Sequence, residues 1–201
     1  MSRKSRTLLL SCLVVLVGFG AAGCTGDTAA GSDADSPASF EVQGNEAVMT
    51  GVIGESTPDA VSDLIDDHPE VTTIVLTDVP GSDNDEANLE ASSLVRQAQL
   101  ATHVPADGLI ASGGVDFFLA GAERSFDDGA EFGVHSWATG DGVNGDELSR
   151  DDPQHDPYLN YYDSIGVDQE FYWFTLQAAP PESFHIMTAG ELDEYNFASS
   201  R

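Results

Sequence analysis

The sequence has few positive charges. Its 201 residues include 7 Lys+Arg against 35 Asp+Glu, which gives a formal net charge of −28, and its single lysine is Lys4. Such a chain repels phosphate backbones and anionic headgroups, so we expect no nucleic-acid partner and no broad basic face for membranes. Two origins of the acidity remain open. It reflects either genome composition or adaptation to high salt, where ions screen the repulsion between carboxylates.

Cysteine is scarce too, and no apolar run reaches the length of an ordinary membrane span. The two cysteines are Cys12 and Cys24. A basic head at residues 3–6 and a 13-residue apolar run at 8–20 precede Ala-Ala-Gly-Cys, a pattern typical of an export signal. This ending resembles the lipobox of lipoproteins, so we expect residues 1–23 to be a signal peptide and Cys24 to be the lipidated first mature residue.

The alternative is a plain secretory signal with an incidental cysteine. In either case Cys12 leaves with the signal, and a lone cysteine cannot form an intramolecular disulfide. Residues 24–39 are small and polar, which predicts a flexible acidic linker. The lipid bilayer, reached through Cys24, is therefore an expected partner. The expected location is the extracytoplasmic face of the cell membrane.

Residues 40–201 form the predicted folded domain, in which β-type and helical patterns alternate. Predicted strands lie at 40–43, 47–53, 71–77, 109–111, 131–137 and 183–187. Predicted helices lie at 58–67, 85–100, from 113 to about 121, at 157–178 with a break near Gly166, and at 191–195. The acidic, glycine-rich segment 138–157 is predicted to be a surface loop. Alternating β-α units indicate the α/β class with a largely parallel sheet.

The strand-to-helix turn at Ser112 carries the first sign of chemistry. A serine there projects its hydroxyl at the edge of the sheet, and the following helix offers unpaired N–H groups. Gly113 would let a substrate approach the main chain closely. The Pro-Gly turn at Gly81 also follows a buried strand, and His135 is predicted at the end of a central strand. Taken alone, a serine in this context is more often a helix N-cap, and the Pro-Gly turn can be an ordinary connection between strand and helix.

Together these segments resemble the Clp-protease/crotonase superfamily, and in particular its exported Clp-proteolytic-subunit-like branch. The resemblance covers roughly residues 48–197 and rests on three stretches in family order, at 71–81, 110–124 and 130–137. It implies stacked β-α units around a largely parallel sheet. It also implies Ser112 as nucleophile, His135 as general base, and an oxyanion hole from the N–H groups at Gly81 and Gly113. The resemblance further implies an extended peptide as substrate or ligand. It is compatible with a homo-oligomer, and it implies no cofactor or metal.

Two positions depart from the family pattern. Ser82 stands where the family has a second glycine, and the positions that match its catalytic aspartate hold Phe184 and His185. The nearest carboxylate is Glu182, which we take as the candidate third catalytic residue. The leading hypothesis is a membrane-anchored serine peptidase. The alternative is an inactive lipoprotein that binds peptides in the same groove.

An acyl-CoA enzyme is disfavoured, because no basic cluster could hold the phosphates of the cofactor. The remaining histidines, His68, His103 and His155, are interpreted as solvated or packed. The acidic segment 141–147 lacks the spacing of a calcium-binding EF-hand, so no metal site is predicted.

Overall fold

The computed structural model describes residues 36–140 and 142–199. The predicted signal peptide, Cys24 and most of the predicted linker lie outside this range. Within it, no helix is long and apolar enough to cross a membrane.

A mixed sheet of eight strands organises the domain. Its main path runs β1-β2-β3-β5-β7-β8, while β4 pairs with β3 and with β6. The β2/β3, β3/β5 and β5/β7 pairs are parallel, and only the outer pairs β1/β2 and β7/β8 are antiparallel. The strands are β1 Ser39–Gln43, β2 Glu46–Thr50, β3 Thr73–Val79, β4 Ala101–Val104, β5 Leu109–Ala111, β6 Arg124–Phe126, β7 Glu131–Val134 and β8 His185–Ile186. The predicted α/β class with a largely parallel sheet is confirmed.

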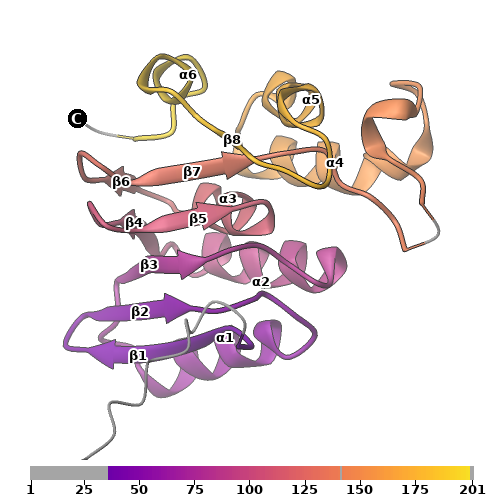
Figure 1. Ribbon diagram of the computed structural model, residues 1–201. Coiled ribbons are helices and arrows are strands. Elements are labelled where there is room, and N and C mark those ends of the chain that lie inside the picture. Colours follow the sequence, from indigo (N-terminus) through magenta and orange to yellow (C-terminus); the bar gives the residue numbers. More distant parts are fainter. Residues whose placement is uncertain (1–35, 141, 200–201) are drawn as a thin grey trace, which may run out of the picture. The chain divides into compact units, whose positions relative to one another are not determined.

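The helices are α1 Thr57–Asp67, α2 Asp85–Gln97, α3 Gly113–Leu119, α4 Asp156–Ile165, α5 Gln169–Ala178 and α6 Ala189–Glu194. Helices α1, α2 and α3 connect strands of the parallel part, as this topology requires, whereas α4 and α5 lie between β7 and β8 and α6 follows β8. Figure 1 shows the strands stacked from β1 to β8, with α1, α2 and α3 following in the same order beside them. The predicted break near Gly166 is confirmed, because this residue ends α4 in the left-handed conformation that glycine adopts without cost.

The sheet divides at β3, which pairs with β4 at its start and with β5 at its end. The first residues of β3, from Thr73 to Val75, pair with β4, whereas Asp78 and Val79 at its end pair with β5. The ends of β3, β5 and β7 therefore lie at one edge of the sheet, because these three strands are parallel neighbours. Ligand sites of open α/β sheets form at this carboxyl edge.

Aromatic rings fill the part of the core between β7, α3 and α5. Phe132 of β7 lies 5.2 Å from Phe118 of α3 and 5.3 Å from Phe197, measured between ring centroids, and Phe197 lies 5.2 Å from Phe171 of α5. Arg124 holds the chain near Phe197 in place, because its Nε donates a 3.0 Å hydrogen bond to the Phe197 carbonyl. The C-terminal segment thus completes the core beside the candidate site.

One sequence prediction needs correction. Segment 138–157 is not simply a surface loop: it contains 3₁₀ turns at Gly145–Glu147 and Pro153–His155, and its last residues already belong to α4. The His155 side chain is fully buried and packs against Trp173, with ring centroids 4.8 Å apart. Of the two interpretations of His155, solvated or packed, the structure confirms the second. Alternation of apolar residues could not reveal this, because the segment is held by single aromatic contacts and by hydrogen bonds such as those of Ser136 with Asp146 and of His155 with Tyr172.

Candidate functional site

Ser112 occupies the turn between β5 and α3 in a main-chain conformation that residues other than glycine rarely adopt. Its φ is +50° and its ψ is −127°. The turn is fixed by main-chain hydrogen bonds, in which the Ser112 N–H donates to the Gly133 carbonyl at 2.9 Å and the Val115 N–H donates to the Ser112 carbonyl at 2.8 Å. Its hydroxyl makes no capping bond to the helix. Strained residues of this kind cluster at active sites and ligand sites, so Ser112 stays a candidate functional residue.

Gly81 packs against Ser112. It has a φ of +147°, and a Cβ atom placed there would lie 3.1 Å from Ser112 Cβ and 3.6 Å from Ser112 Oγ. The Gly81 carbonyl accepts a 2.9 Å bond from Ile53 N–H, which ties the turn after β3 to the chain after β2. The two turns that the sequence singled out therefore meet in space, although 31 positions separate them.

Gly113 is required by close packing against the same turn. A Cβ atom on Gly113 would lie 2.5 Å from Ser82 Oγ and 2.9 Å from Asn88 Nδ2. Ser82 Oγ donates to Asp85 Oδ1 at 2.7 Å. As the first residue of α3, Gly113 has an N–H with no acceptor inside the helix.

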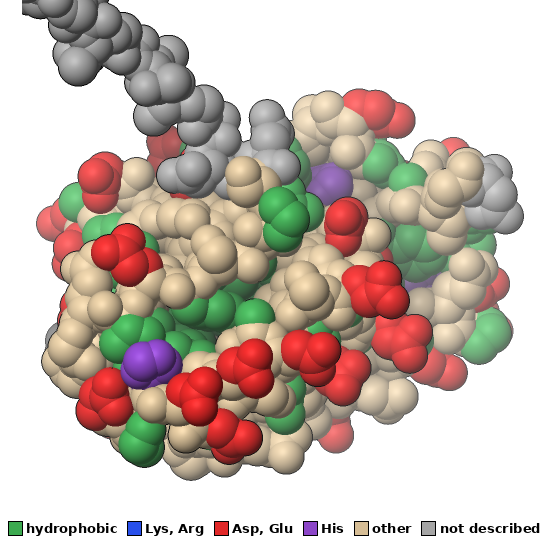
Figure 2. Space-filling model, turned by 90° about the horizontal axis from the view of Figure 1, so that it is seen from below, with side chains coloured by type: hydrophobic (Ala, Val, Ile, Leu, Met, Phe, Trp, Pro, Cys, Tyr) green, Lys and Arg blue, Asp and Glu red, His purple; other side chains and the backbone are tan. Residues whose placement is uncertain are grey.

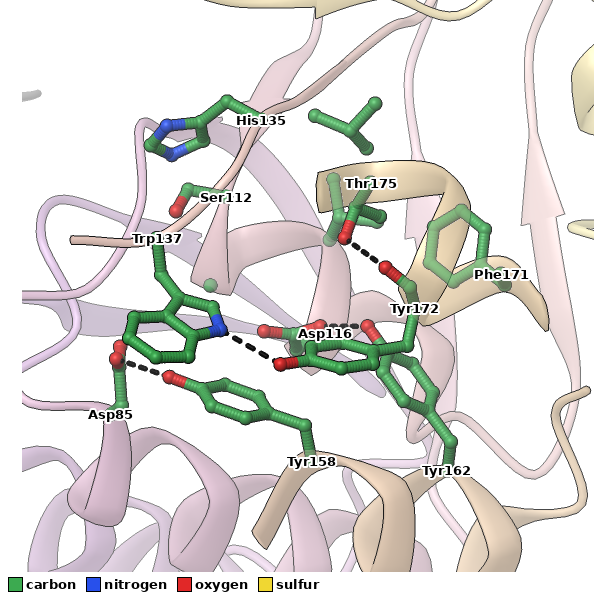
Figure 3. Close-up of a pocket in the computed structure, with 13 residues that line it drawn as sticks. Asp85, Ser112, Asp116, His135, Trp137, Tyr158, Tyr162, Phe171, Tyr172 and Thr175 are labelled. Atoms are coloured by element: carbon green, nitrogen blue, oxygen red, sulfur yellow. Dashed lines mark hydrogen bonds between the residues drawn. The ribbon is translucent and has the colours of Figure 1, made fainter. Parts of the chain in front are cut away.

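His135 follows β7 and lines the same pocket as Ser112, as Figure 3 shows. No hydrogen bond joins the two side chains among the residues described. His135 Nδ1 is buried without a hydrogen-bond partner. Burial lowers the pKa of His135, opposed in part by the main chain at Pro181 and the charge of Asp85. A neutral imidazole at neutral pH is the form that a general base needs.

The sequence-predicted acid, Glu182, is not brought to this histidine. Glu182 is exposed, and within the described chain it makes no hydrogen bond to His135. The ring of Phe184 lies against His135 instead, with centroids 4.7 Å apart and planes at 78°. His185 turns to α6, where its Nε2 lies 3.0 Å from a Glu191 oxygen. Pairing of β7 with β8 sets this arrangement, since Val134 lies opposite His185.

The remaining walls of the pocket come from residues that sequence reasoning missed. They surround a cavity of about 40 Å³, enough for a few water-sized atoms. Besides Ser112 and His135, the polar and aromatic residues of the lining are Asp85, Asp116, Trp137, Tyr158, Tyr162, Phe171, Tyr172 and Thr175. Asp116 could have been found, because it lies four positions after Ser112 and hence one helical turn along α3. Tyr158 and Tyr162 have the same spacing on α4.

The two aspartates of the pocket sit in different polar settings. Asp85 Oδ2 accepts a 2.5 Å bond from Tyr158 Oη. Asp116 accepts a short bond from Tyr162 Oη and lies 3.5 Å from Asn88 Nδ2. Burial raises the pKa of Asp116 to about 7, the Tyr162 bond opposes the rise, and the charge of Asp85 adds to it. Asp116 therefore exchanges a proton near neutral pH.

Metal chemistry has no evident ligand set here. Among residues 36–140 and 142–199, no group of three or more His, Cys, Asp or Glu side chains could hold an ion. Asp141, the first residue of the acidic segment, falls outside these ranges.

Fold and site together define an α/β protein with a strained serine and a histidine at the carboxyl edge of a largely parallel sheet. The sequence matches no protein-family model and no curated protein. Solved structures do resemble the chain. A variant of the 1510-N membrane-bound stomatin-specific protease in complex with a substrate peptide is 13% identical, with a TM-score of 0.49, over 77% of this chain and 71% of that chain.

Acyl-CoA enzymes are also among the similar structures. An enoyl-CoA hydratase from Polaromonas sp. JS666 is 12% identical, with a TM-score of 0.48, over 81% of this chain and 69% of that chain. A monofunctional enoyl-CoA isomerase from M. smegmatis is 17% identical, with a TM-score of 0.47, over 81% and 75%. With identities of 12 to 17% and TM-scores below 0.5, these likenesses assign neither a family nor an activity to the chain.

Proposed function

We propose that this protein is a Clp-type serine peptidase that acts on extended peptides outside the cytoplasm. The observation that carries the proposal is the strained Ser112, uncommitted to capping, in one pocket with His135. Among the described residues that line the pocket there is no lysine, and His135 is the candidate base.

The proposed reaction is acyl transfer to Ser112. Its Oγ bonds to the carbonyl carbon of the substrate while its proton passes to His135. The oxygen that becomes negative is stabilised by the N–H groups at Gly81 and Gly113, at about 3 kcal/mol for each donor. His135 then gives the proton to the leaving amine as the C–N bond breaks, and water hydrolyses the ester on Ser112.

A fluorophosphonate probe tests the nucleophile directly, because it reacts only with an activated serine. We expect the wild type to be labelled and Ser112→Ala to be silent. Ser149→Ala provides the matched control, because Ser149 is exposed and remote from the pocket lining. A wild type that is folded by circular dichroism but unlabelled would overturn the peptidase proposal.

A non-catalytic peptide-binding protein is the second candidate. The ring of Phe184 lies where a carboxylate would orient His135, and this supports the candidate. Loss of the acid costs about 10⁴ in kcat where a serine triad has been tested. Binding of peptides by a protein that fluorophosphonate does not label would favour this candidate.

We also propose that Cys24 carries a lipid that holds the domain at the outer face of the membrane. The support is the small-residue run before Cys24 and the polar segment after it. Cys24→Ser should release a folded protein into the medium or leave an uncleaved precursor, with loss of metabolic palmitate labelling. A mature-length variant that still sediments with membranes would refute the anchor.

A further inference from the structure

The cavity beyond Ser112 carries negative charge that no cation balances. Asp85 lines it from the start of α2 and Asp116 from α3, and no lysine or arginine of residues 36–140 and 142–199 belongs to the lining. Each carboxylate accepts hydrogen bonds only from neutral groups that the structure gives: Ser82 and Tyr158 for Asp85, Tyr162 and Asn88 for Asp116. Asp85 is exposed at the mouth of the cavity and Asp116 is more deeply buried, and hydrogen bonds from neutral groups orient both carboxylates but leave their charge unpaired.

The three arginines of the described residues make their contacts elsewhere, and Arg150 pairs with Glu170 at 3.3 Å. Arg96 donates to the Gly121 and Ile165 carbonyls at 3.1 and 3.0 Å, and Arg124 donates to the Asn196 and Phe197 carbonyls. The other titratable side chains that face the cavity are His135 and the tyrosines. The pair of carboxylates is therefore open to a cation that arrives with a ligand.

Aromatic faces line the way to these carboxylates. Trp137 and Tyr158 lie nearly parallel, with centroids 6.0 Å apart and planes at 13°, and Tyr158 stacks in the same way on Tyr172 at 5.3 Å. Trp137 Nε1 donates to Tyr172 Oη at 2.8 Å, which locks two of the rings together. Such a wall suits an aliphatic stem and attracts a positive charge through its π faces.

We propose that this cavity is a specificity site for a basic side chain, lysine or arginine, of the residue next to the bond that Ser112 attacks. The inference rests on the proposed function, because it assigns a substrate class to the same pocket. In Figure 3, Ser112 and His135 lie toward one end of the pocket and Asp85 with Tyr158 toward the other. A side chain entering past the serine would thus bring its charged end to the carboxylates.

Two further properties agree with this assignment. A cavity of about 40 Å³ has room for about three water-sized atoms, which suits the end of such a side chain and not a bulky ring. A cation would favour the ionised form of Asp116, whose pKa is about 7 without one. Binding of a basic ligand should therefore strengthen as pH rises from 6 to 8, with release of a proton.

The test measures binding and does not depend on catalysis. Ser112→Ala protein is titrated by calorimetry with acetyl-Ala-Ala-Lys-amide, with the arginine analogue, and with the norleucine analogue, whose side chain is uncharged and of similar length. We expect the basic peptides to bind at least tenfold more tightly than norleucine. Equal or tighter binding of norleucine would overturn the proposal.

Variants then locate the preference. Asp85→Asn and, independently, Asp116→Asn should each reduce the advantage of lysine over norleucine to less than threefold. Asp63→Asn on α1, outside the pocket, should leave it unchanged. A preference that survives in both pocket variants, each checked by thermal melting, would place the cation elsewhere. Butylamine should bind much more weakly than the lysine peptide, and equal binding would make this a site for free amines and refute the peptide assignment.

The outcome is separable from the test of the nucleophile. Fluorophosphonate labelling without a preference for lysine would refute only the specificity site. A preference for lysine without labelling would leave the site standing in a protein that binds peptides but does not cut them.

Discussion

A single position, Phe184, decides whether the candidate site of Ser112 and His135 has an acid beside the histidine. Ser112 is held in its strained conformation by the strand and helix on either side of it, whereas His135 lacks the carboxylate that would fix its orientation. Phe184 takes that place, half-exposed and edge-on to the imidazole. The acid is missing because of a single side chain, Phe184. The main-chain pairing of β8 with β7 does not depend on which side chain stands at that position.

Phe184→Asp should therefore improve the site. A carboxylate beside His135 would favour the imidazolium that forms during attack, so we expect esterase activity toward a nitrophenyl ester to rise at least tenfold at pH 8. The new charge would also raise the pKa of His135, which burial now lowers, and so move the acidic limb of the pH profile to higher pH. Phe184→Ala opens the same space without a charge. Equal effects of both changes would contradict the explanation.

Asp116 gives a prediction for stability against pH. Its pKa lies near 7 in the fold against 3.8 when unperturbed, so the folded state holds this proton more tightly than the unfolded chain does. The stabilisation that Asp116 provides is complete below about pH 4 and is lost as pH rises through 7. Asparagine mimics the protonated form at every pH. Asp116→Asn should raise the melting temperature at pH 8 and leave it unchanged at pH 4, and a gain of equal size at both values would refute the assignment.

At the scale of elements, two connections build the site: the turn from β3 to α2 and the turn from β5 to α3. They touch where Gly81 meets Ser112 and Gly113 meets Ser82: an added Cβ would be tight at Gly81, at 3.1 Å, and would clash at Gly113, at 2.5 Å. The parallel pairing of β3 with β5 brings both to one edge, and β7 adds His135 there. Helix α4 then closes the pocket with Tyr158 and Tyr162.

Gly113→Ala tests this contact between turns. The added methyl would lie 2.5 Å from Ser82 Oγ, so α3 must shift away from α2, at a cost of about 1–3 kcal/mol in unfolding free energy. We expect fluorophosphonate labelling of Ser112 to slow at least tenfold in protein that is still folded at 20 °C. Gly190→Ala in α6 is the control, because the nearest atom to its new methyl is 3.9 Å away. Normal labelling of Gly113→Ala would show that the contact does not position the serine.

At the scale of the whole molecule, charge dominates. Figure 2 shows acidic side chains around a hollow with an apolar floor, and no lysine or arginine is visible on that face. With a formal net charge of −28, carboxylates repel one another over the folded surface more strongly than in the expanded chain. Salt shortens the range of this repulsion from about 10 Å at 0.1 M to 3 Å at 1 M.

The melting temperature should therefore rise steadily between 0.05 and about 2 M NaCl, and KCl should act alike because screening depends on ionic strength. Differential scanning calorimetry at constant pH measures the effect. Sucrose provides a control for general exclusion from the surface. A melting temperature that is flat in salt would show that the acidity is compositional and not an adaptation to salt.

The sequence alone determined the kind and order of most elements, because strands and helices differ in apolar period and are bounded by local caps and turns. It also placed Ser112, Gly81 and His135 at strand ends, which parallel pairing must bring together. It missed the short strand β6 and the buried part of segment 138–157, since neither has enough residues to form a period.

Only the tertiary structure decided the chemical character of the pocket. Asp85, Asp116 and Tyr158 come from three helices, and no local pattern relates them, because their proximity depends on how those helices pack. The same holds for the acid beside His135. Glu182 is near in sequence, yet the pairing of β7 with β8 points Phe184 at the imidazole and leaves Glu182 in solvent. Side-chain direction at such a site is set by strand register, which long-range contacts fix.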